Sequence, residues 1–195
     1  MPVARHVTDT PPSSGSGEPS PRTSLGTAAG LYVVMLGVAF LWLWGRGRQD
    51  EFARVAIGEH GPWIGSATGL VVGWLGARAM ERFGRRSQRL QDVERLTADL
   101  FRRVGDMEAV LFLLVAAIAE EVFFRLAVQD AFGLAGSVAT YVLVNSSVGG
   151  LGMVPFTALH ALATGLLVQH GFGLLGATTA HAIMNYLSLR RVLCT

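Results

Sequence analysis

Two adjacent carboxylates and an arginine interrupt an apolar segment of the chain. Glu120, Glu121 and Arg125 lie within LLVAAIAEEVFFRLAV. Carboxylates in such surroundings are costly unless they are paired, protonated or hydrated, so their placement indicates a functional role. Glu121 and Arg125 are four residues apart, which predicts an ion pair on one face of a helix. Glu120 lies about 100° around that helix and is left to face a cavity.

Histidines and amides follow in three later pairs with the same spacing, which places the two members of each pair on one helical face. The pairs are Tyr141 with Asn145, Phe156 with His160, and His181 with Asn185. Counting about 1.5 Å per residue from the predicted turns puts Glu120 and one polar residue of each pair on the order of 12–15 Å deep. Four predicted helices therefore bring polar side chains to one level.

This combination of residues predicts hydrolysis by an activated water. A carboxylate in a low-dielectric pocket beside a second carboxylate makes a usable general base near neutral pH. We expect Glu120 to take a proton from a water that attacks a peptide carbonyl, while His160 or His181 holds that water. Glu120, His160 and His181 are also a possible set of zinc ligands, although the sequence has no HExxH motif.

The amides and the ion pair complete the predicted site. Asn185, with Asn145 as a possible helper, would donate a hydrogen bond to the developing oxyanion. Arg125 would hold Glu121 in place and contribute to the local field. The predicted catalytic set contains both carboxylates, the arginine, both histidines and both asparagines.

The motifs in this order resemble the CPBP family of intramembrane glutamic endopeptidases, which includes the type II CAAX prenyl endopeptidases and the abortive-infection homologues. EEVFFR, ending at Arg125, matches EExxxR; FTALH, ending at His160, matches FxxxH; and HAIMN, ending at Asn185, matches HxxxN. The resemblance covers Met107 to Arg191. It implies a glutamate as general base, with histidine and asparagine as orienting and oxyanion groups, and the myxosortase-like branch is the nearest parallel.

The second motif departs from the family pattern. Family members carry the FxxxH histidine on the helix directly after EExxxR, where this chain has Asn145; His160 comes one predicted helix later. Either the short connection displaces the motif, or Asn145 replaces the family histidine and His160 compensates. The second alternative favours a catalytically weak or inactive scaffold or immunity protein of the same fold. A small transporter is a third possibility, but the halves of the chain show no inverted repeat.

Composition places these residues in a membrane. Of 195 residues, 51% are hydrophobic and only 15% are charged, which excludes an ordinary soluble domain. All 16 basic residues are arginine, and a net charge of +2 is too small to indicate nucleic acid binding. The expected partners are therefore the lipid bilayer and a membrane-associated protein substrate, with no cofactor required.

The apolar runs predict an all-α, multi-pass transmembrane bundle of about six spans around a catalytic four-helix core. Residues 1–24 form a disordered tail, 25–80 a two-helix transmembrane hairpin, 81–106 a basic amphipathic connection, and 107–191 the protease core. The spans are expected at Gly26–Trp44, Gly61–Met80, 107–129, 134–149, 153–170 and 173–190.

The distribution of arginine predicts the orientation. Seven arginines lie in 81–106, with two in the tail and two at the C-terminal end, against three between the first two spans. Both termini are therefore expected in the cytoplasm of a bacterial cell. With that orientation, the depth count places the site nearer the non-cytoplasmic face, which favours an exported or lipidated protein as substrate.

Overall fold

The computed structural model describes residues 21–193 apart from 86 and 104, and within this range its secondary structure is entirely helical. The predicted all-α fold is therefore confirmed. The tail lies outside the described residues, except that the first helix already begins at Pro21. The elements are α1 (Pro21–Gly45), α2 (Gln49–Ile57), α3 (Gly61–Gly84), α4 (Gln88–Arg102), α5 (Asp106–Glu121), the π-helical segment η1 (Val122–Val128), α6 (Gln129–Gly149), the 3₁₀ turn η2 (Leu151–Met153), α7 (Val154–Gln169) and α8 (Gly173–Leu193).

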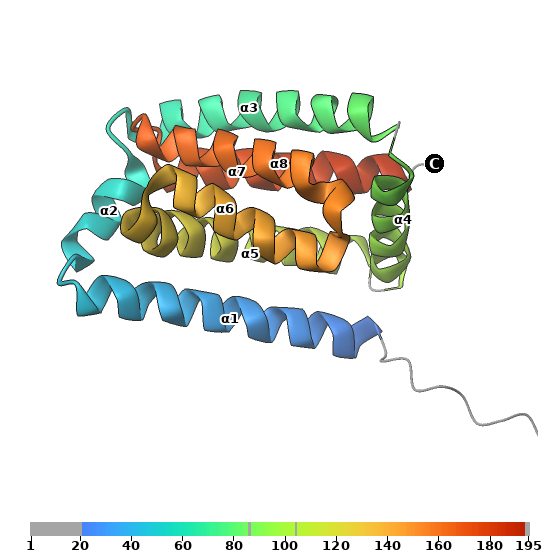
Figure 1. Cartoon of the computed structure of the whole chain (residues 1–195), viewed down its shortest axis with the longest axis horizontal. Helices are drawn as coiled ribbons and strands as arrows, with labels where there is room; N and C mark the ends of the chain where they lie inside the picture. Colours follow the sequence, from blue (N-terminus) through green and yellow to red (C-terminus); the bar gives the residue numbers. More distant parts are fainter. Residues whose placement is uncertain (1–20, 86, 104, 194–195) are drawn as a thin grey trace, which may run out of the picture.

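The four predicted core spans correspond to α5 with η1, most of α6, α7, and α8. A kink at Gly133 separates the first two, with φ 68° and ψ −178° inside α6. Only glycine adopts this backbone conformation without strain, so the chain reverses at the predicted turn. The helices of this core lie side by side along the long axis of the molecule (Figure 1).

Helix α3 packs very closely on α8. Its glycines at 65, 69 and 73 recur every four residues on the side that meets α8. A Cβ atom built on Gly69 would stand 2.2 Å from the carbonyl oxygen of Gly176, and one built on Gly73 would stand 2.5 Å from that of Ala180. Small residues at this spacing let two helix backbones approach, as in membrane helix pairs.

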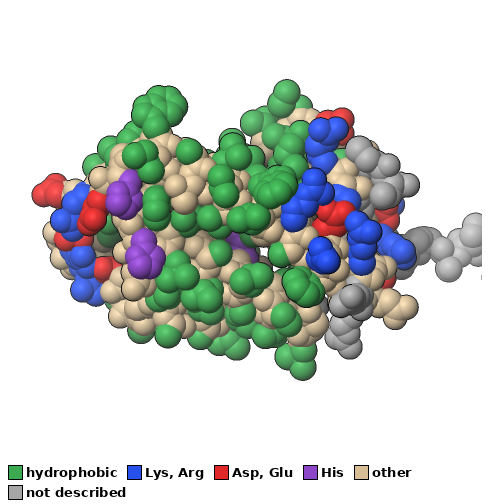
Figure 2. Space-filling model, turned by 90° about the horizontal axis from the view of Figure 1, so that it is seen from above, with side chains coloured by type: hydrophobic (Ala, Val, Ile, Leu, Met, Phe, Trp, Pro, Cys, Tyr) green, Lys and Arg blue, Asp and Glu red, His purple; other side chains and the backbone are tan. Residues whose placement is uncertain are grey.

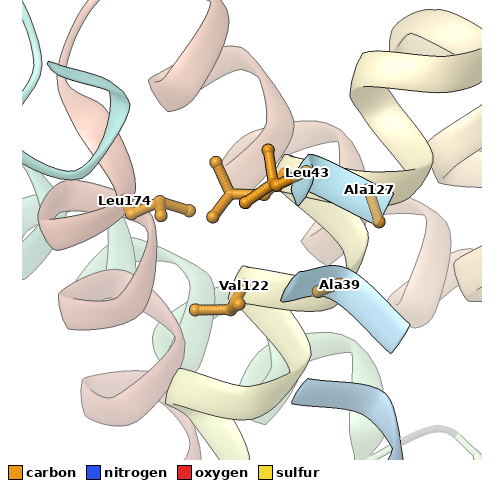
Figure 3. Packing of buried hydrophobic residues seen from close by; sticks show 6 residues of the cluster. Ala39, Leu43, Val122, Ala127 and Leu174 are labelled. Atoms are coloured by element: carbon orange, nitrogen blue, oxygen red, sulfur yellow. The ribbon is translucent and has the colours of Figure 1, made fainter. Parts of the chain in front are cut away.

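Helix α1 covers the opposite side of the core. Ala39 and Leu43 of α1 pack with Val122 and Ala127 of η1 and with Leu174 of α8 (Figure 3). Helices α1 and α3 thus lie on opposite sides of the core, joined by α2 at one end (Figure 1). The structure differs here from the predicted hairpin of 25–80, because each helix finds its partner in the core.

Helix α4 runs across the other end of the bundle, roughly at right angles to the long helices (Figure 1). Ala98 and Phe101 are buried, whereas Arg95 and Arg102 are exposed. This division fits the predicted amphipathic connection.

Apolar side chains cover the middle of the visible face, and arginines and acidic residues gather at both ends (Figure 2). Among the residues that the structure describes, two helices have the length and hydropathy of a membrane span: Gly26–Gly45, with 20 residues and mean hydropathy 1.9, and Leu151–Gln169, with 19 residues and 1.7. Only 11% of the most apolar part of the first segment is buried inside the molecule. The other four spans remain predictions.

Candidate active site

Glu121 lies fully buried at the centre of the core and is paired on both oxygens. Arg125 Nε donates to its Oε2 at 2.8 Å, which confirms the predicted ion pair. His181 Nδ1 lies 2.8 Å from its Oε1. A buried carboxylate needs such partners, and here they come from its own helix and from α8.

Arg125 spreads its remaining donors over two further helices. Its Nη1 donates to Ser137 Oγ of α6 at 2.9 Å, and its Nη2 donates to Thr164 Oγ1 of α7 at 2.7 Å. Arg125 belongs to the π-helical segment η1, a rare geometry that is frequent at functional sites. One arginine thus fixes the position of Glu121 relative to α6 and α7.

Glu120 points to a different set of partners. Tyr141 donates its hydroxyl to Oε2 at 3.1 Å, and Tyr32 of α1 donates to Oε1 at 3.4 Å. His181 Nε2 lies 4.0 Å from Oε2. Glu120 has no partner on its own helix, as predicted, but its contacts with the tyrosines were not expected. Tyr32 was not predicted, because it is a single tyrosine within an apolar segment. The one signal that could have indicated it is that a buried tyrosine hydroxyl needs a polar partner.

His160 lies against the same carboxylates. Its ring meets that of His181 edge-on, with centroids 4.3 Å apart and an interplanar angle of 72°. Its Nε2 is 3.6 Å from Glu121 Oε1 and has no hydrogen-bond partner within the described part of the chain. Asn145 instead donates its Nδ2 to the backbone oxygen of Tyr141, one turn back on α6. In this fold, His160 and not Asn145 stands beside the carboxylates.

A pocket of about 140 Å³ opens onto the two histidines. Both predicted oxyanion donors, Asn145 and Asn185, line it. Within the part of the chain that the structure describes, its lining includes neither Glu120 nor Glu121, so the prediction that Glu120 faces a cavity is not met by this pocket. The lining residues are Met80, Tyr141, Asn145, Met153, Phe156, Thr157, His160, His181, Met184 and Asn185.

The pocket mouth faces the end of the molecule that carries α4. Met80 lies near the end of α3, Asn145 lies near the end of α6, and Met153 lies in the connection to α7. These three ends meet at α4 (Figure 1). The depth count from the opposite turns had placed the site nearer the other end. Glu120 lies near the middle of its helix, between Asp106 and the kink at Gly133, whereas several residues that line the pocket lie toward the α4 end.

The donor set for a metal differs from the predicted one. One ligand atom each from Glu121, His160 and His181 lie within 4.8 Å of one another. The carboxylate that joins the two histidines is therefore Glu121, whereas the sequence favoured Glu120. Two nitrogens and one carboxylate oxygen suit zinc, and the pocket would leave room for a further ligand. Against this, Glu121 already pairs with Arg125, and a nearby guanidinium disfavours a cation.

Comparison of the chain with protein-family models, with curated proteins and with solved structures finds no match. The molecule is thus defined by its fold and by its site. The described residues form an all-helical protein with a largely buried cluster of two carboxylates, two histidines and an arginine, and both histidines also line a pocket together with two asparagines.

Proposed function

We propose that the chain is an intramembrane endopeptidase that hydrolyses a peptide bond of a membrane-anchored or lipidated protein with a glutamate-activated water, as its resemblance to the CPBP family implies. One observation carries the proposal. His181 binds Glu121 through Nδ1, and its Nε2 lies 4.0 Å from Glu120 Oε2. A water held by His181 Nε2 and Glu120 Oε2 would be positioned for activation.

The steps follow from this geometry. Glu120 takes a proton from the water, whose oxygen bonds to the carbonyl carbon of the substrate. The carbonyl oxygen gains negative charge and accepts a hydrogen bond from Asn185 or Asn145. The carbon–nitrogen bond then breaks, and Glu120 returns its proton to the leaving amine. Tyr32 and Tyr141 hold Glu120 in position throughout.

The surface supports a membrane location and a direction of entry. Apolar side chains lie along the middle of the visible face between charged ends (Figure 2). Many of the large apolar side chains of α1 are exposed, such as Val33 at 68% and Leu41 at 66%. The pocket opens at the α4 end, which carries most of the arginines and is therefore expected in the cytoplasm. A substrate presented from the cytoplasmic side fits this geometry better than an exported protein.

The test compares C-terminal peptides of membrane proteins, measured by mass spectrometry, in cells that carry the wild type, Glu120→Gln or His181→Ala. The matched control is Glu108→Gln, which changes an exposed carboxylate on the same helix. We expect the same uncleaved precursors in both site variants at unchanged protein level, and normal processing with the control. If Glu120→Gln processes like Glu108→Gln, the mechanism is refuted. Unchanged profiles in both site variants would favour a scaffold protein.

A zinc-dependent hydrolase is the second candidate, because Glu121, His160 and His181 converge. In it these three residues would hold the ion, which would supply Lewis acidity to the water. Metal content of the purified protein separates the two candidates. Three results together would favour the zinc mechanism over the glutamate mechanism. The purified wild type would contain zinc and His160→Ala would not. A chelator would abolish activity, and added zinc would restore it.

A further inference from the structure

A second pocket lies between α3 and α8, near the end that carries α4. Its volume is about 330 Å³, and it is separate from the pocket at the histidines. Arginines supply much of its polar lining, together with one carboxylate and one hydroxyl. The lining residues are Trp74, Ala77, Arg78, Glu81, Leu187, Ser188, Arg190 and Arg191.

Arginines outnumber acidic residues in the lining of this pocket. Its one acidic group, Glu81, accepts hydrogen bonds from Arg85 and from Arg78, and these hold the pKa of the Glu81 carboxyl below its usual value. The lining therefore presents three guanidinium groups and one ionised carboxylate. Ser188 adds a buried hydroxyl without a hydrogen-bond partner in the described range. Guanidinium and hydroxyl donors around a hollow are the groups that bind phosphate oxygens.

The wall of the pocket is apolar on the side toward the middle of the molecule. Trp74 lies one turn before Arg78, whose guanidinium stands 5.6 Å from the centre of the Trp74 ring. Leu70 and Val71 continue this exposed face of α3, each 53% exposed. A tryptophan at the boundary between apolar and basic surface is typical of the membrane interface. The pocket therefore offers a charged site for a headgroup directly beside an apolar surface for acyl chains.

We propose that this pocket binds the phosphate headgroup of an anionic phospholipid, with the acyl chains lying along α3 past Trp74. The proposal rests on the membrane location proposed above, and not on proteolysis. A small phosphate compound would use the arginines but would gain nothing from the exposed apolar face, so the lipid is the better occupant. Basic pockets between helices on the cytoplasmic side are a recurring form of lipid recognition.

The test measures the thermal stability of the full chain in detergent during titration with dioleoylphosphatidylglycerol. Dioleoylphosphatidylcholine and glycerol 3-phosphate are the comparison ligands. We expect a saturable rise in melting temperature with the anionic lipid alone. Arg190→Gln/Arg191→Gln should weaken that binding about thirtyfold, as expected from about 1 kcal/mol for each arginine. Arg95→Gln/Arg103→Gln removes the same charge from exposed positions at the same end and should bind like the wild type.

The outcomes separate the explanations. Equal weakening in both double variants would overturn the proposal, because it would indicate general charge attraction. An equal rise with phosphatidylcholine would overturn the headgroup selectivity, and an equal rise with glycerol 3-phosphate would assign the site to soluble phosphates. Because no cleavage is measured, a protein that binds the lipid but processes no substrate would refute only the proposed protease function.

Discussion

At the scale of single residues, Arg125 is the side chain on which the candidate site depends most. It is buried, and it donates to Glu121, Ser137 and Thr164 from three different helical segments. A buried carboxylate that loses its cation becomes an uncompensated charge, and the cost is larger than that of an ordinary hydrogen bond. The long side chain and planar guanidinium of Arg125 suit this arrangement, because their donors point to three acceptors at once. The single ammonium group of a lysine could not reach all three.

Replacement of Arg125 should therefore destabilise the protein strongly. We expect Arg125→Ala to lower the free energy of unfolding by about 3–5 kcal/mol, because Glu121 stays buried without its cation. Arg125→Lys should recover part of this loss by keeping the charge. Denaturation in mixed micelles, followed by circular dichroism, measures both. Arg95→Ala, at an exposed position, is the control, and an equal effect of Arg95→Ala and Arg125→Ala would refute the argument.

The parts of the site that could be predicted are those encoded within one helix. The pair Glu121–Arg125 follows from a spacing of four residues, and so does the shared face of His181 and Asn185. The contact of Glu120 with Tyr32 joins residues from α1 and α5, and no local pattern indicates it. The choice between Asn145 and His160 likewise depends on how α6 and α7 lie against α5, so the sequence left both open.

At the scale of helices, α3 and α8 approach each other very closely, because glycines of α3 take the place of larger side chains at the contact. Gly69 and Gly73 of α3 face carbonyl oxygens of α8, so atoms added there would meet backbone rather than flexible side chains. Backbone cannot move aside at low cost, because each helix is held along its whole length. Since α8 carries His181, this contact also fixes the position of His181 along the long axis of the molecule.

A single methyl group should be enough to disturb this contact. We expect Gly69→Ala to lower the free energy of unfolding by about 1–3 kcal/mol, the usual cost of overpacking, although alanine is the better helix former. Gly30→Ala is the matched control, because a Cβ at Gly30 has no atom within 4 Å and the change should be neutral or stabilising. Thermal unfolding of both variants measures the difference, and an unchanged Gly69→Ala protein would show that the two helices can separate.

The long helices were predictable, but the short helix α2 and the partners of α1 and α3 were not. Glycine at 133 and the Gly171–Gly173 turn mark chain reversals that the structure places where the sequence put them. Helix α1 is apolar around most of its surface, so no stripe indicates which side faces a neighbour. In α3 the glycines at every fourth position mark the packing side but not the partner helix. The sequence therefore favoured a simple hairpin, whereas each helix packs on its own side of the core.

At the scale of the whole molecule, the direction of the pocket and the distribution of arginine together define an orientation. Helix α4 lies at one end, toward which several residues of the pocket lining lie. The turn between α2 and α3, residues 58–60, lies at the other end (Figure 1). If the α4 end lies in the cytoplasm, substrate reaches the histidines from the cytoplasm. The opposite orientation would place the same pocket outside the cell and would favour exported substrates, so the orientation decides the substrate class.

Single cysteines in a Cys194→Ser background, expressed in a bacterial host, test this orientation. Arg103→Cys reports on the α4 end, Met153→Cys on the pocket mouth, and Glu59→Cys on the opposite end. We expect a membrane-impermeant maleimide to label the first two in inside-out vesicles and Glu59→Cys in intact cells, because positive loops stay in the cytoplasm. Labelling of Met153→Cys from the same side as Glu59→Cys would contradict the pocket direction. Labelling of Arg103→Cys and Met153→Cys together from outside would keep the fold but invert the protein, and substrates would then be sought among exported proteins.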